Sequence, residues 1–455
     1  MSDLSSGVSE LSSSFSGRLL LPADPEWDDA RRVHNGLVNK RPALVAQCRG
    51  SADIALAVHF ARDRGLEIAV RGGGHNVGGR STIDGGLVID LSLMKYVHVD
   101  AAARTARAAG GTLWAQFNRE TQVHGLATTG GVVSSTGVAG LTLGGGLGWL
   151  MPKHGMSLDN LLGVEMVLAD GRVVRAAADE NPDLFWAVRG GGGNFGVASS
   201  FEFRLHPVGP VVTGGLVAWP VDRARDVLRL YRDLAAEAGD DLMLVAALIT
   251  GPDAATKLVA IAAGHFGEAA AAAKALAPIK SFGQPAMDAM GPMAYTQINA
   301  MLDASYPRGA RNYWKSHFCE RLEDRAIDTI VDAFMRCPSP MGQIVIEHFH
   351  GAATRVLPTD AAYALRSSGF NVLLLSQWKD AADDAAGSAW ARDSYAALKR
   401  FVGPSRYLNY LDQDDVGDRV LAAAYGPNVG RLQSIKAKYD PENVFHQNVN
   451  IPPRA

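Results

Sequence analysis

The sequence predicts an α+β protein built from two large domains. Three glycine tracts, at residues 72–86, 125–148 and 190–196, fall in the first half of the 455-residue chain, between short apolar runs that predict strands. After Pro207 and Pro210 such tracts disappear, and strand-like runs alternate with amphipathic helical runs. The clustered glycines indicate shaped loops in the first part, and the second part is typical of an α+β domain with a mainly antiparallel sheet.

The first part begins with a strand–helix–strand unit. Residues 42–47 and 66–70 predict strands, and the helix between them is expected to be capped by Ser51 and ended by Gly65. The other elements expected here are hairpins over 97–109 and 164–177, a helix from a Thr112 cap to Gly125, and a strand over 200–205.

The second part is expected to contain five main strands and three helices before a distinct C-terminal segment. The strands are predicted over 214–219, 242–250, 257–265, 343–349 and 370–378, and the helices over 221–237, 267–278 and 320–335. A helix is predicted over 431–439, and the tail after it is expected to pack on the first domain. The resulting division is an extension over 1–35, domains over 36–208 and 209–403, and a returning segment over 404–455.

Composition excludes several classes of function. The net charge is −3 and basic residues form no long cluster, so nucleic acid is not an expected partner. No stretch of 18 uninterrupted apolar residues occurs, and the Ser-rich start lacks the features of a secretory signal, so we expect a cytoplasmic protein with a frayed N-terminus and no membrane partner. The three cysteines, Cys48, Cys319 and Cys337, have neither disulfide nor zinc spacing.

The first glycine tract carries the strongest functional signal. It reads Arg71-Gly-Gly-Gly-His75-Asn76 directly after a predicted strand, which is a favoured position for ligands in α/β units. Glycine allows a ligand to approach the main chain closely, and successive backbone N–H groups can form an anion-binding nest. We therefore predict that a phosphate-bearing ligand lies beside His75.

Several motifs in order along the chain resemble those of one family. They are Arg71-Gly-Gly-Gly-His75-Asn, Asp84-Gly-Gly, Gly144-Gly-Gly-x-Gly148, Lys153-His-Gly-x-x-x-Asp159-Asn160, Arg189-Gly-Gly-Gly-Gly-Asn-Phe-Gly196, Tyr407-x-Asn-Tyr410 and Tyr439-Asp-Pro-x-Asn-x-Phe. Together they resemble the FAD-linked oxidases with a PCMH-type flavin domain, in the berberine-bridge-enzyme-like branch and, among bacterial members, the 6-hydroxy-D-nicotine oxidase type. The resemblance covers nearly the whole chain and implies a two-domain PCMH/VAO-type flavoprotein.

The resemblance also implies which residues contact the cofactor. In such enzymes the first loop wraps the FAD pyrophosphate, and the second and third tracts and the C-terminal tail contact the rest of the flavin nucleotide. The implied FAD contacts are Arg71, Gly72, Gly73, Gly74, His75, Asn76, Gly79, Thr136, Gly137, Gly140, Leu141, Gly144, Gly145, Gly146, Gly148, Trp149, Asn160, Gly196, Val197, Asn448 and Asn450. For any one of these glycines or asparagines, a purely structural role in a turn or a cap remains an alternative.

His75 stands where family members join the flavin covalently to a histidine. Many relatives add a second link through a cysteine four residues before the glycine that is here Gly137, but this chain has Val133 there. We therefore predict FAD attached through His75 only, with no cysteinyl link. Thr136 occupies the position that is argued in plant relatives to gate oxygen, where Val or Leu is usual.

On the substrate side, Tyr410 matches the family's catalytic tyrosine, and Tyr407 lies on the same motif. A phenol can act as a base only if nearby positive charge or hydrogen bonding favours the phenolate. The acidic base of some relatives corresponds to Asn371, whose amide cannot accept a proton, and this favours Tyr410 as the base. Two aromatic residues that merely fill the space between domains are the alternative.

Two further residues are assigned to the substrate pocket, Trp314 and Glu347. Glu347 stands in a polar cluster with His348 and His350. These histidines share one face of a predicted strand but lack a third ligand, so no metal site is predicted.

These expectations add up to an FAD-dependent oxidase. It would take hydride from a C–OH or C–NH carbon of a small organic molecule to flavin N5 and pass the electrons to dioxygen, giving hydrogen peroxide. A flavin dehydrogenase with another electron acceptor is the first alternative, and a non-catalytic binder of a phosphate-bearing ligand is the second. An NAD-dependent dehydrogenase is disfavoured because no GxGxxG opens a helix with an acidic residue about 20 positions later. The oligomeric state stays open, with a homodimer as one alternative.

Overall fold

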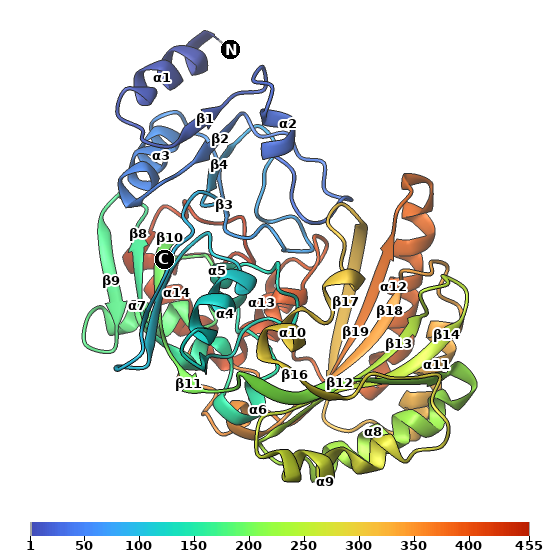
Figure 1. Ribbon diagram of the computed structural model, residues 1–455. Helices are drawn as coiled ribbons and strands as arrows, with labels where there is room; N and C mark the ends of the chain where they lie inside the picture. Colours follow the sequence, from blue (N-terminus) through green and yellow to red (C-terminus); the bar gives the residue numbers. More distant parts are fainter. Residues whose placement is uncertain (1, 455) are drawn as a thin grey trace.

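The computed structural model describes residues 2–454, which form four β-sheets with helices packed around them (Figure 1). The sheets contain four, five, two and eight strands. The first three come from the glycine-rich half of the chain, and the eight-stranded sheet comes from residues 211–378. The mixture of helices, one partly parallel sheet and several antiparallel pairings confirms the predicted α+β class.

The four-stranded sheet has the strand order β1-β2-β4-β3. β4 pairs in parallel with both β2 and β3, so the strand that follows the first glycine loop lies between the two strands of the predicted strand–helix–strand unit. All four residues of β4 are buried, as expected for a central strand covered on both faces. The elements here are α1 (Ser2–Ser12), β1 (Arg18–Leu20), α2 (Trp27–Ala30), β2 (Leu44–Gln47), α3 (Ser51–Asp63), β3 (Ile68–Arg71) and β4 (Leu87–Asp90).

The N-terminus is more ordered than predicted. Residues that were predicted to be frayed form α1. Val8, Leu11 and Phe15 are buried in the same apolar cluster as residues of α3. β1 pairs with β2, so part of the predicted 1–35 extension belongs to the first sheet. The helix was not predicted because the apolar residues of α1 are separated by serines, which are poor helix formers.

The five-stranded sheet has the order β5-β6-β10-β8-β9 and is antiparallel throughout. Both predicted hairpins are present in it. The elements are β5 (Val97–Asp100), β6 (Thr105–Ala109), α4 (Trp114–Gln122), α5 (Val138–Leu143), α6 (Met151–His154), β8 (Leu161–Val167), β9 (Val173–Ala177), α7 (Pro182–Val188) and β10 (Val197–Arg204), with β7 (Leu126–Ala127) and β11 (His206–Pro207) forming the two-stranded sheet.

Two helix-cap predictions in this half are wrong. Gly50 is the N-cap of α3, and the hydroxyl of Ser51 instead donates to Glu165 Oε1 at 2.8 Å. Leu113 is the N-cap of α4, and the hydroxyl of Thr112 donates to the carbonyl of Tyr96. In both cases the hydroxyl donates to an acceptor outside the helix, and the side chain does not cap the helix.

The eight-stranded sheet is antiparallel, with the order β15-β12-β14-β13-β18-β19-β17 and β16 added beside β12. Helices α8, α9, α11 and α12 lie along one of its faces (Figure 1). The strands are β12 (Val211–Pro220), β13 (Leu242–Thr250), β14 (Lys257–His265), β15 (Met287–Asp288), β16 (Gly291–Ala294), β17 (Arg311–Cys319), β18 (Gln343–Phe349) and β19 (Gly369–Trp378), and the helices are α8 (Ala224–Glu237), α9 (Ala269–Lys280), α10 (Tyr295–Ala300), α11 (Asp324–Met335) and α12 (Asp384–Leu398).

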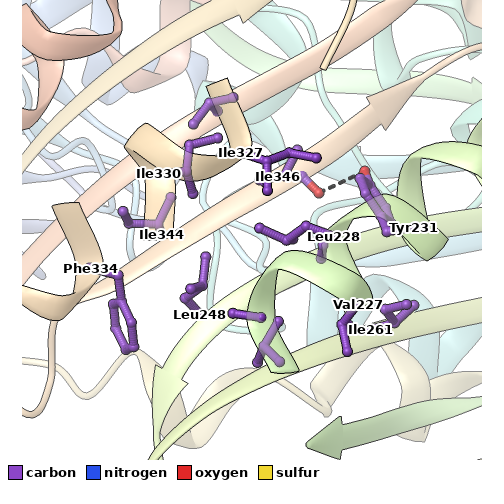
Figure 2. Close-up of a cluster of buried hydrophobic side chains, with 14 of the residues drawn as sticks. Val227, Leu228, Tyr231, Leu248, Ile261, Ile327, Ile330, Phe334, Ile344 and Ile346 are labelled. Carbon is purple, nitrogen blue, oxygen red and sulfur yellow. Dashed lines mark hydrogen bonds between the residues drawn. The ribbon is translucent and has the colours of Figure 1, made fainter. Parts of the chain in front are cut away.

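The core beneath these helices fixes which way β18 faces. Ile344 and Ile346 point from β18 toward α8 and α11, and the hydroxyl of Tyr231 donates to the carbonyl of Ile346 at 2.9 Å (Figure 2). Because successive side chains of a strand point to opposite faces, Val345 and Glu347 must face away from this core. The packing of one face of the sheet therefore aims Glu347 at the interior between the domains.

β17 and α12 are the two longest of the elements that were absent from the prediction, which also lacked β15, β16 and α10. β17 contains five polar or charged residues among nine, so its apolar pattern is weak. α12 is built largely from alanine, serine and charged residues, which also weakens any amphipathic signal. Both elements are buried by neighbours distant in sequence, β17 by pairing with β19 and α12 by packing on the two strands.

The C-terminal segment contacts the third glycine tract. Its helices are α13 (Asp418–Tyr425) and α14 (Val429–Tyr439). The buried ammonium of Lys436 donates to the carbonyl of Asn194 at 2.6 Å and pairs with Asp440 at 2.6 Å. Asn448 donates to the carbonyl of Gly193 at 3.0 Å, so the tail is tied to the third glycine tract. No helix within residues 2–454 is long and apolar enough to cross a lipid bilayer.

Candidate active site

One cavity lies where the three glycine tracts meet the inner face of the eight-stranded sheet and the 407–410 turn. Its wall brings together residues more than 300 positions apart in the chain, such as Gly73 and Tyr410. Of the residues predicted to contact cofactor or substrate, the wall includes Gly72, Gly73, Gly74, His75, Asn76, Thr136, Gly137, Gly140, Leu141, Gly144, Gly196, Asn448, Trp314, Glu347, Tyr407 and Tyr410.

The first glycine loop has the geometry of an anion-binding nest. The backbone N–H groups of residues 73–76 donate to no acceptor in the described part of the chain, and Gly74 adopts a positive φ of 68°. A Cβ added to Gly73 would lie 2.4 Å from the backbone nitrogen of Gly137, so the first and second tracts touch along their backbones. Free donors beside a close backbone approach fit the phosphates of a dinucleotide.

Several predicted cofactor contacts lie outside the described cavity wall, and Arg71 and Asn160 among them have partners within the protein. Arg71 forms a buried ion pair with Asp90 at 2.7 Å, which ties the ends of β3 and β4 together. The Asn160 amide donates to the carbonyls of His154 and Met156, and Asn450 is exposed to solvent. The predicted cofactor residues that do not line the cavity are Arg71, Gly79, Gly145, Gly146, Gly148, Trp149, Asn160, Val197 and Asn450.

His75 lines the cavity between the first two tracts. Its Nε2 lies 2.9 Å from the hydroxyl oxygen of Ser135 in the second tract. Burial lowers the pKa of His75 to about 3, with a further contribution from His34, whose ring stacks on it. The imidazole is therefore neutral at physiological pH, which is the form that can act as a nucleophile.

Glu347 is the centre of a short hydrogen-bonded chain on the opposite wall. Its Oε1 accepts from the Tyr410 hydroxyl at 2.9 Å, and its Oε2 accepts from the Asn371 amide at 2.8 Å. Burial raises the pKa of Glu347 to about 7, although both hydrogen bonds oppose this shift. The carboxyl can therefore exchange a proton near neutral pH.

The surroundings of Tyr410 do not favour the phenolate that a tyrosine base requires. Burial, and the negative charge of Glu347 beside it, raise the pKa of Tyr410 well above its usual value. Tyr410 is thus a neutral phenol that donates to a carboxylate. Asn371, which was expected to stand at the acidic position of some relatives, lies opposite Glu347 in the β18–β19 register, so a carboxyl is present one strand away.

Tyr407 has a different role from Tyr410. Its hydroxyl oxygen accepts from the backbone nitrogens of Gly146 and Leu147 at 3.1 and 3.3 Å and from the Asn409 amide at 2.9 Å. Burial raises the pKa of Tyr407 to about 12. Its ring meets Tyr410 edge-on at a centroid distance of 4.8 Å. Tyr407 therefore joins the second glycine tract to the 407–410 turn and orients Tyr410.

His348 of β18 and His350, one residue beyond its end, are absent from the described cavity wall. His348 and His350 stack at a centroid distance of 4.1 Å, and His348 also stacks on Phe370. By strand alternation they share the side of Ile346, opposite to Glu347. Burial lowers the pKa values of both histidines, so this is a neutral stack in the helix-covered half of the sheet.

The prediction missed several residues of the wall. Tyr306, which precedes β17, meets Trp314 edge-on with the two ring centroids 6.1 Å apart. Leu373 reaches the cavity from β19. Arg80 follows the first tract and donates to the carbonyls of Asp412 and Asp415 in the C-terminal segment. Tyr306 and Leu373 stand in segments without any motif, whereas Arg80 could have been suspected from its place in the Gly78-Gly79-Arg80 sequence.

Comparison with known proteins supplies the family. A family model described as an FAD binding domain matches residues 42–177, and one described as berberine and berberine like matches residues 406–452. The chain is 33% identical over 451 residues to (R)-6-hydroxynicotine oxidase of Paenarthrobacter nicotinovorans, an alignment that covers 97% of each protein. The chain belongs to the FAD-linked, berberine-like oxidoreductases. Its membership confirms the predicted family, the flavin cofactor and the enzymatic nature of the protein.

The fold of this FAD-linked oxidoreductase agrees with solved structures. The crystal structure of 6-hydroxy-D-nicotine oxidase from Arthrobacter nicotinovorans matches it with a TM-score of 0.88 at 32% identity, covering 97% of this chain and 99% of that one. A structure of glucooligosaccharide oxidase from Acremonium strictum matches with a TM-score of 0.88 at 28% identity, covering 99% and 100%. That protein is described with a 6-S-cysteinyl, 8α-N1-histidyl FAD. The predicted two-domain flavoprotein fold is thereby confirmed.

Proposed function

We propose that this enzyme is an oxidase that removes a hydride equivalent from a carbon bearing a hydroxyl or amine group of a small organic molecule. Bound FAD would supply the two-electron acceptor at its N5, and its reoxidation by dioxygen would yield hydrogen peroxide. The observation that carries the proposal is the Tyr410–Glu347 hydrogen bond, which lies in the same cavity as the first glycine loop, called the glycine cradle below. A proton acceptor and a flavin site thus share one enclosed space.

The proposed proton path runs through Tyr410 to Glu347. As the substrate's hydroxyl or amine loses its proton, the Tyr410 oxygen accepts it and the tyrosine's own proton moves to Glu347 Oε1, 2.9 Å away. This order avoids a free phenolate, which the raised pKa of Tyr410 disfavours. Glu347 is the group that finally holds the proton, and Asn371 holds the carboxyl in place through Oε2.

We further propose that the flavin is attached through His75 alone. His75 lines the cavity, and Val133 also lines it where many relatives carry a cysteine. Cys48, Cys319 and Cys337 are absent from the described wall of the cavity. Residues 36–208 and 404–455 would then hold the cofactor, and residues 209–403 would supply the substrate-facing wall.

The substrate end of the cavity favours a compact molecule with an aromatic or aliphatic body. Trp314, Tyr306, Tyr410 and Leu373 line the cavity together with Glu347, and the guanidinium of Arg80 in the described wall donates to a carbonyl of the C-terminal segment. Such walls bind apolar surface and leave the carboxyl and phenol to orient one polar group. A flat, weakly basic or hydroxylated substrate suits this arrangement better than a polyanion.

Three measurements test the proposal. Acid precipitation should leave the yellow colour with the protein, and a colourless precipitate with all flavin in solution would contradict attachment through His75. A panel of small alcohols and amines, read by peroxide release in air, should contain molecules that reduce the flavin. Rapid flavin reduction without peroxide would favour the dehydrogenase alternative, and a flavin-free protein would favour the non-catalytic binder.

A further inference from the structure

The N-terminal strap, residues 31–37, crosses from the first glycine loop to the substrate-domain segment before β17. The backbone nitrogen of His34 donates to the carbonyl of Gly74 at 2.9 Å, and the carbonyl of His34 accepts from Gly309 at 2.9 Å. The backbone nitrogen of Gly36 donates to the carbonyl of Ala310 at 2.8 Å. Residues near the start of the chain are therefore hydrogen-bonded to the first glycine loop, one residue away from His75.

Asn35 fixes the strap more firmly than its backbone alone. Its side-chain amide donates to the carbonyls of Val77 and Asn312 at 2.7 and 2.9 Å, and its oxygen accepts from the backbone nitrogens of Asn312 and Leu37 at 2.8 and 2.9 Å. All of these partners are neutral, and Asn35 is only 2% exposed. The position of the neighbouring His34 is thereby set from both domains.

The ring of His34 has one specific contact, the ring of His75. The two imidazoles stack with their centroids 3.8 Å apart and their planes 23° apart. The His34 side chain makes no hydrogen bond among the described residues. The stack on His75 is therefore the interaction through which the His34 ring can affect its surroundings. Burial lowers the pKa of His34 to about 4, aided by Arg308, so the stack is one between two neutral rings.

The edge of the His75 ring is held separately from its face. Nε2 lies 2.9 Å from the Ser135 oxygen, and the adjacent Ser134 is clamped by Asp303, which accepts from its backbone nitrogen at 2.7 Å and from its hydroxyl at 2.5 Å. With Nε2 engaged, Nδ1 is the ring nitrogen left without a partner in residues 2–454. The imidazole is thus oriented by a stack on one face and a hydrogen bond at one edge.

We propose that His34 is a positioning residue for covalent flavin attachment, holding the His75 imidazole so that Nδ1 meets the 8α carbon of FAD. The inference rests on the proposed link through His75. Attachment forms the Nδ1–C8α bond and breaks one C–H bond of the 8α-methyl group and the imidazole N–H bond. The flavin ring takes up the two electrons and the two protons, and dioxygen reoxidises it and is reduced to hydrogen peroxide.

The stack matters because attachment is an intramolecular reaction between two held groups. Misplacing a reacting atom by about 1 Å can cost on the order of 10²-fold in rate. Without the His34 ring, His75 keeps its Ser135 hydrogen bond but is free to rotate about that edge. We therefore expect slower attachment with little change in the amount of FAD bound, because the glycine cradle that holds the phosphates is untouched.

The test compares His34→Phe with His34→Leu in the full-length flavoprotein. Phe keeps a planar ring against His75, whereas Leu fills similar space without one. Each freshly isolated protein is incubated with excess FAD in air, samples are denatured at intervals, and attached and released flavin are measured separately. Val33→Ala is the control, because it removes buried strap volume without touching the stack.

The expected result is that attachment in His34→Leu slows by about 10-fold or more while total bound FAD is retained. His34→Phe and Val33→Ala should attach flavin within about threefold of the unmodified protein. Equal attachment rates for Leu and Phe would overturn the role of the stack. If His34→Leu binds no FAD, the test depends on His34→Phe. Slow attachment in His34→Phe, which keeps a ring in the stack, would also overturn the role of the stack.

A separate control distinguishes this inference from the proposed link itself. His75→Ala should carry FAD that is wholly released on denaturation. Covalent flavin in His75→Ala, or none in the unmodified protein, would refute the link and the role of His34 together. Covalent flavin that depends on His75 but not on His34 would refute the positioning role alone.

Discussion

Replacing Glu347 by glutamine removes the proposed proton acceptor while nearly preserving its shape. The amide oxygen can still accept from Tyr410, as Oε1 does now at 2.9 Å. The amide nitrogen would face the Asn371 nitrogen that now donates to Oε2, but Asn371 Oδ1 is buried without a partner. Rotation of the Asn371 amide by half a turn therefore gives the new donor an acceptor, and the substitution should be accommodated.

The free-energy consequence follows from the raised pKa. Burial moves the pKa of Glu347 from 4.5 to about 7, so the folded protein binds this proton more tightly than the unfolded chain does. The stability of the wild-type protein must then fall as pH rises from about 4.5 to about 7, by about 3 kcal/mol from this group at 1.36 kcal/mol per unit. The glutamine variant lacks this loss, so its stability relative to wild type should increase across the same window.

Urea unfolding at pH 4.5 and pH 8 measures this difference directly. The variant and the wild type should be similar at the lower pH, and the variant should be the more stable at the higher pH. Glu237→Gln, the same change at an exposed position, should show no such dependence. A Glu347→Gln variant that is equally destabilised at both pH values would refute a carboxyl destabilised by burial.

The same variant tests the proton path through flavin reduction. In the wild type, the rate should rise with pH to a plateau above about 7, because the ionised carboxyl is the active form. Glu347→Gln should be slower by about 10²–10⁴-fold and should lack this dependence. Anaerobic stopped-flow measurement across pH 5–9 gives both quantities. A variant with the wild-type rate and pH profile would remove Glu347 from the mechanism.

Three further changes have expected outcomes. Tyr410→Phe should slow anaerobic flavin reduction by about 10²–10⁴-fold and leave covalent flavin content unchanged, as measured by absorbance after denaturation. Lys436→Met leaves the fully buried Asp440 carboxylate without its partner, so urea unfolding should show a loss of about 3–5 kcal/mol. Gly137→Ala places a Cβ 2.4 Å from the backbone nitrogen of Gly73, so it should separate the two glycine tracts and reduce the flavin content of the purified protein.

Local pattern was sufficient to predict much of the fold and the position of the first glycine loop. The hairpin around Asp170-Gly171 and the strands that bracket the first glycine loop could be predicted because each depends on short-range turn chemistry and apolar periodicity. The motif around His75 located the loop, and the structure places its free backbone N–H groups in the cavity wall.

The substrate end was harder to predict because its contacts cross between elements. Glu347 and Tyr410 are 63 positions apart, and their hydrogen bond depends on the facing of β18 and the path of the 407–410 turn. The acidic position was expected at Asn371 on β19. The carboxyl group in the cavity is that of Glu347, which lies opposite Asn371 on β18. His34 carried no signal at all, because its importance comes from Asn35 bonds that join it to residues 42 and 277 positions away.

The alternation of β18 separates two kinds of change that evolution or an engineer can make. Positions such as Ile344 and Ile346 are constrained by the helices behind the sheet, whereas Val345 and Leu373 face the interior between the domains. A library restricted to the inward positions can alter which molecules enter while the outward layer keeps the domain folded. The substrate range can therefore be altered by substitutions on the inward face of the sheet, without changing the face that packs on the helices.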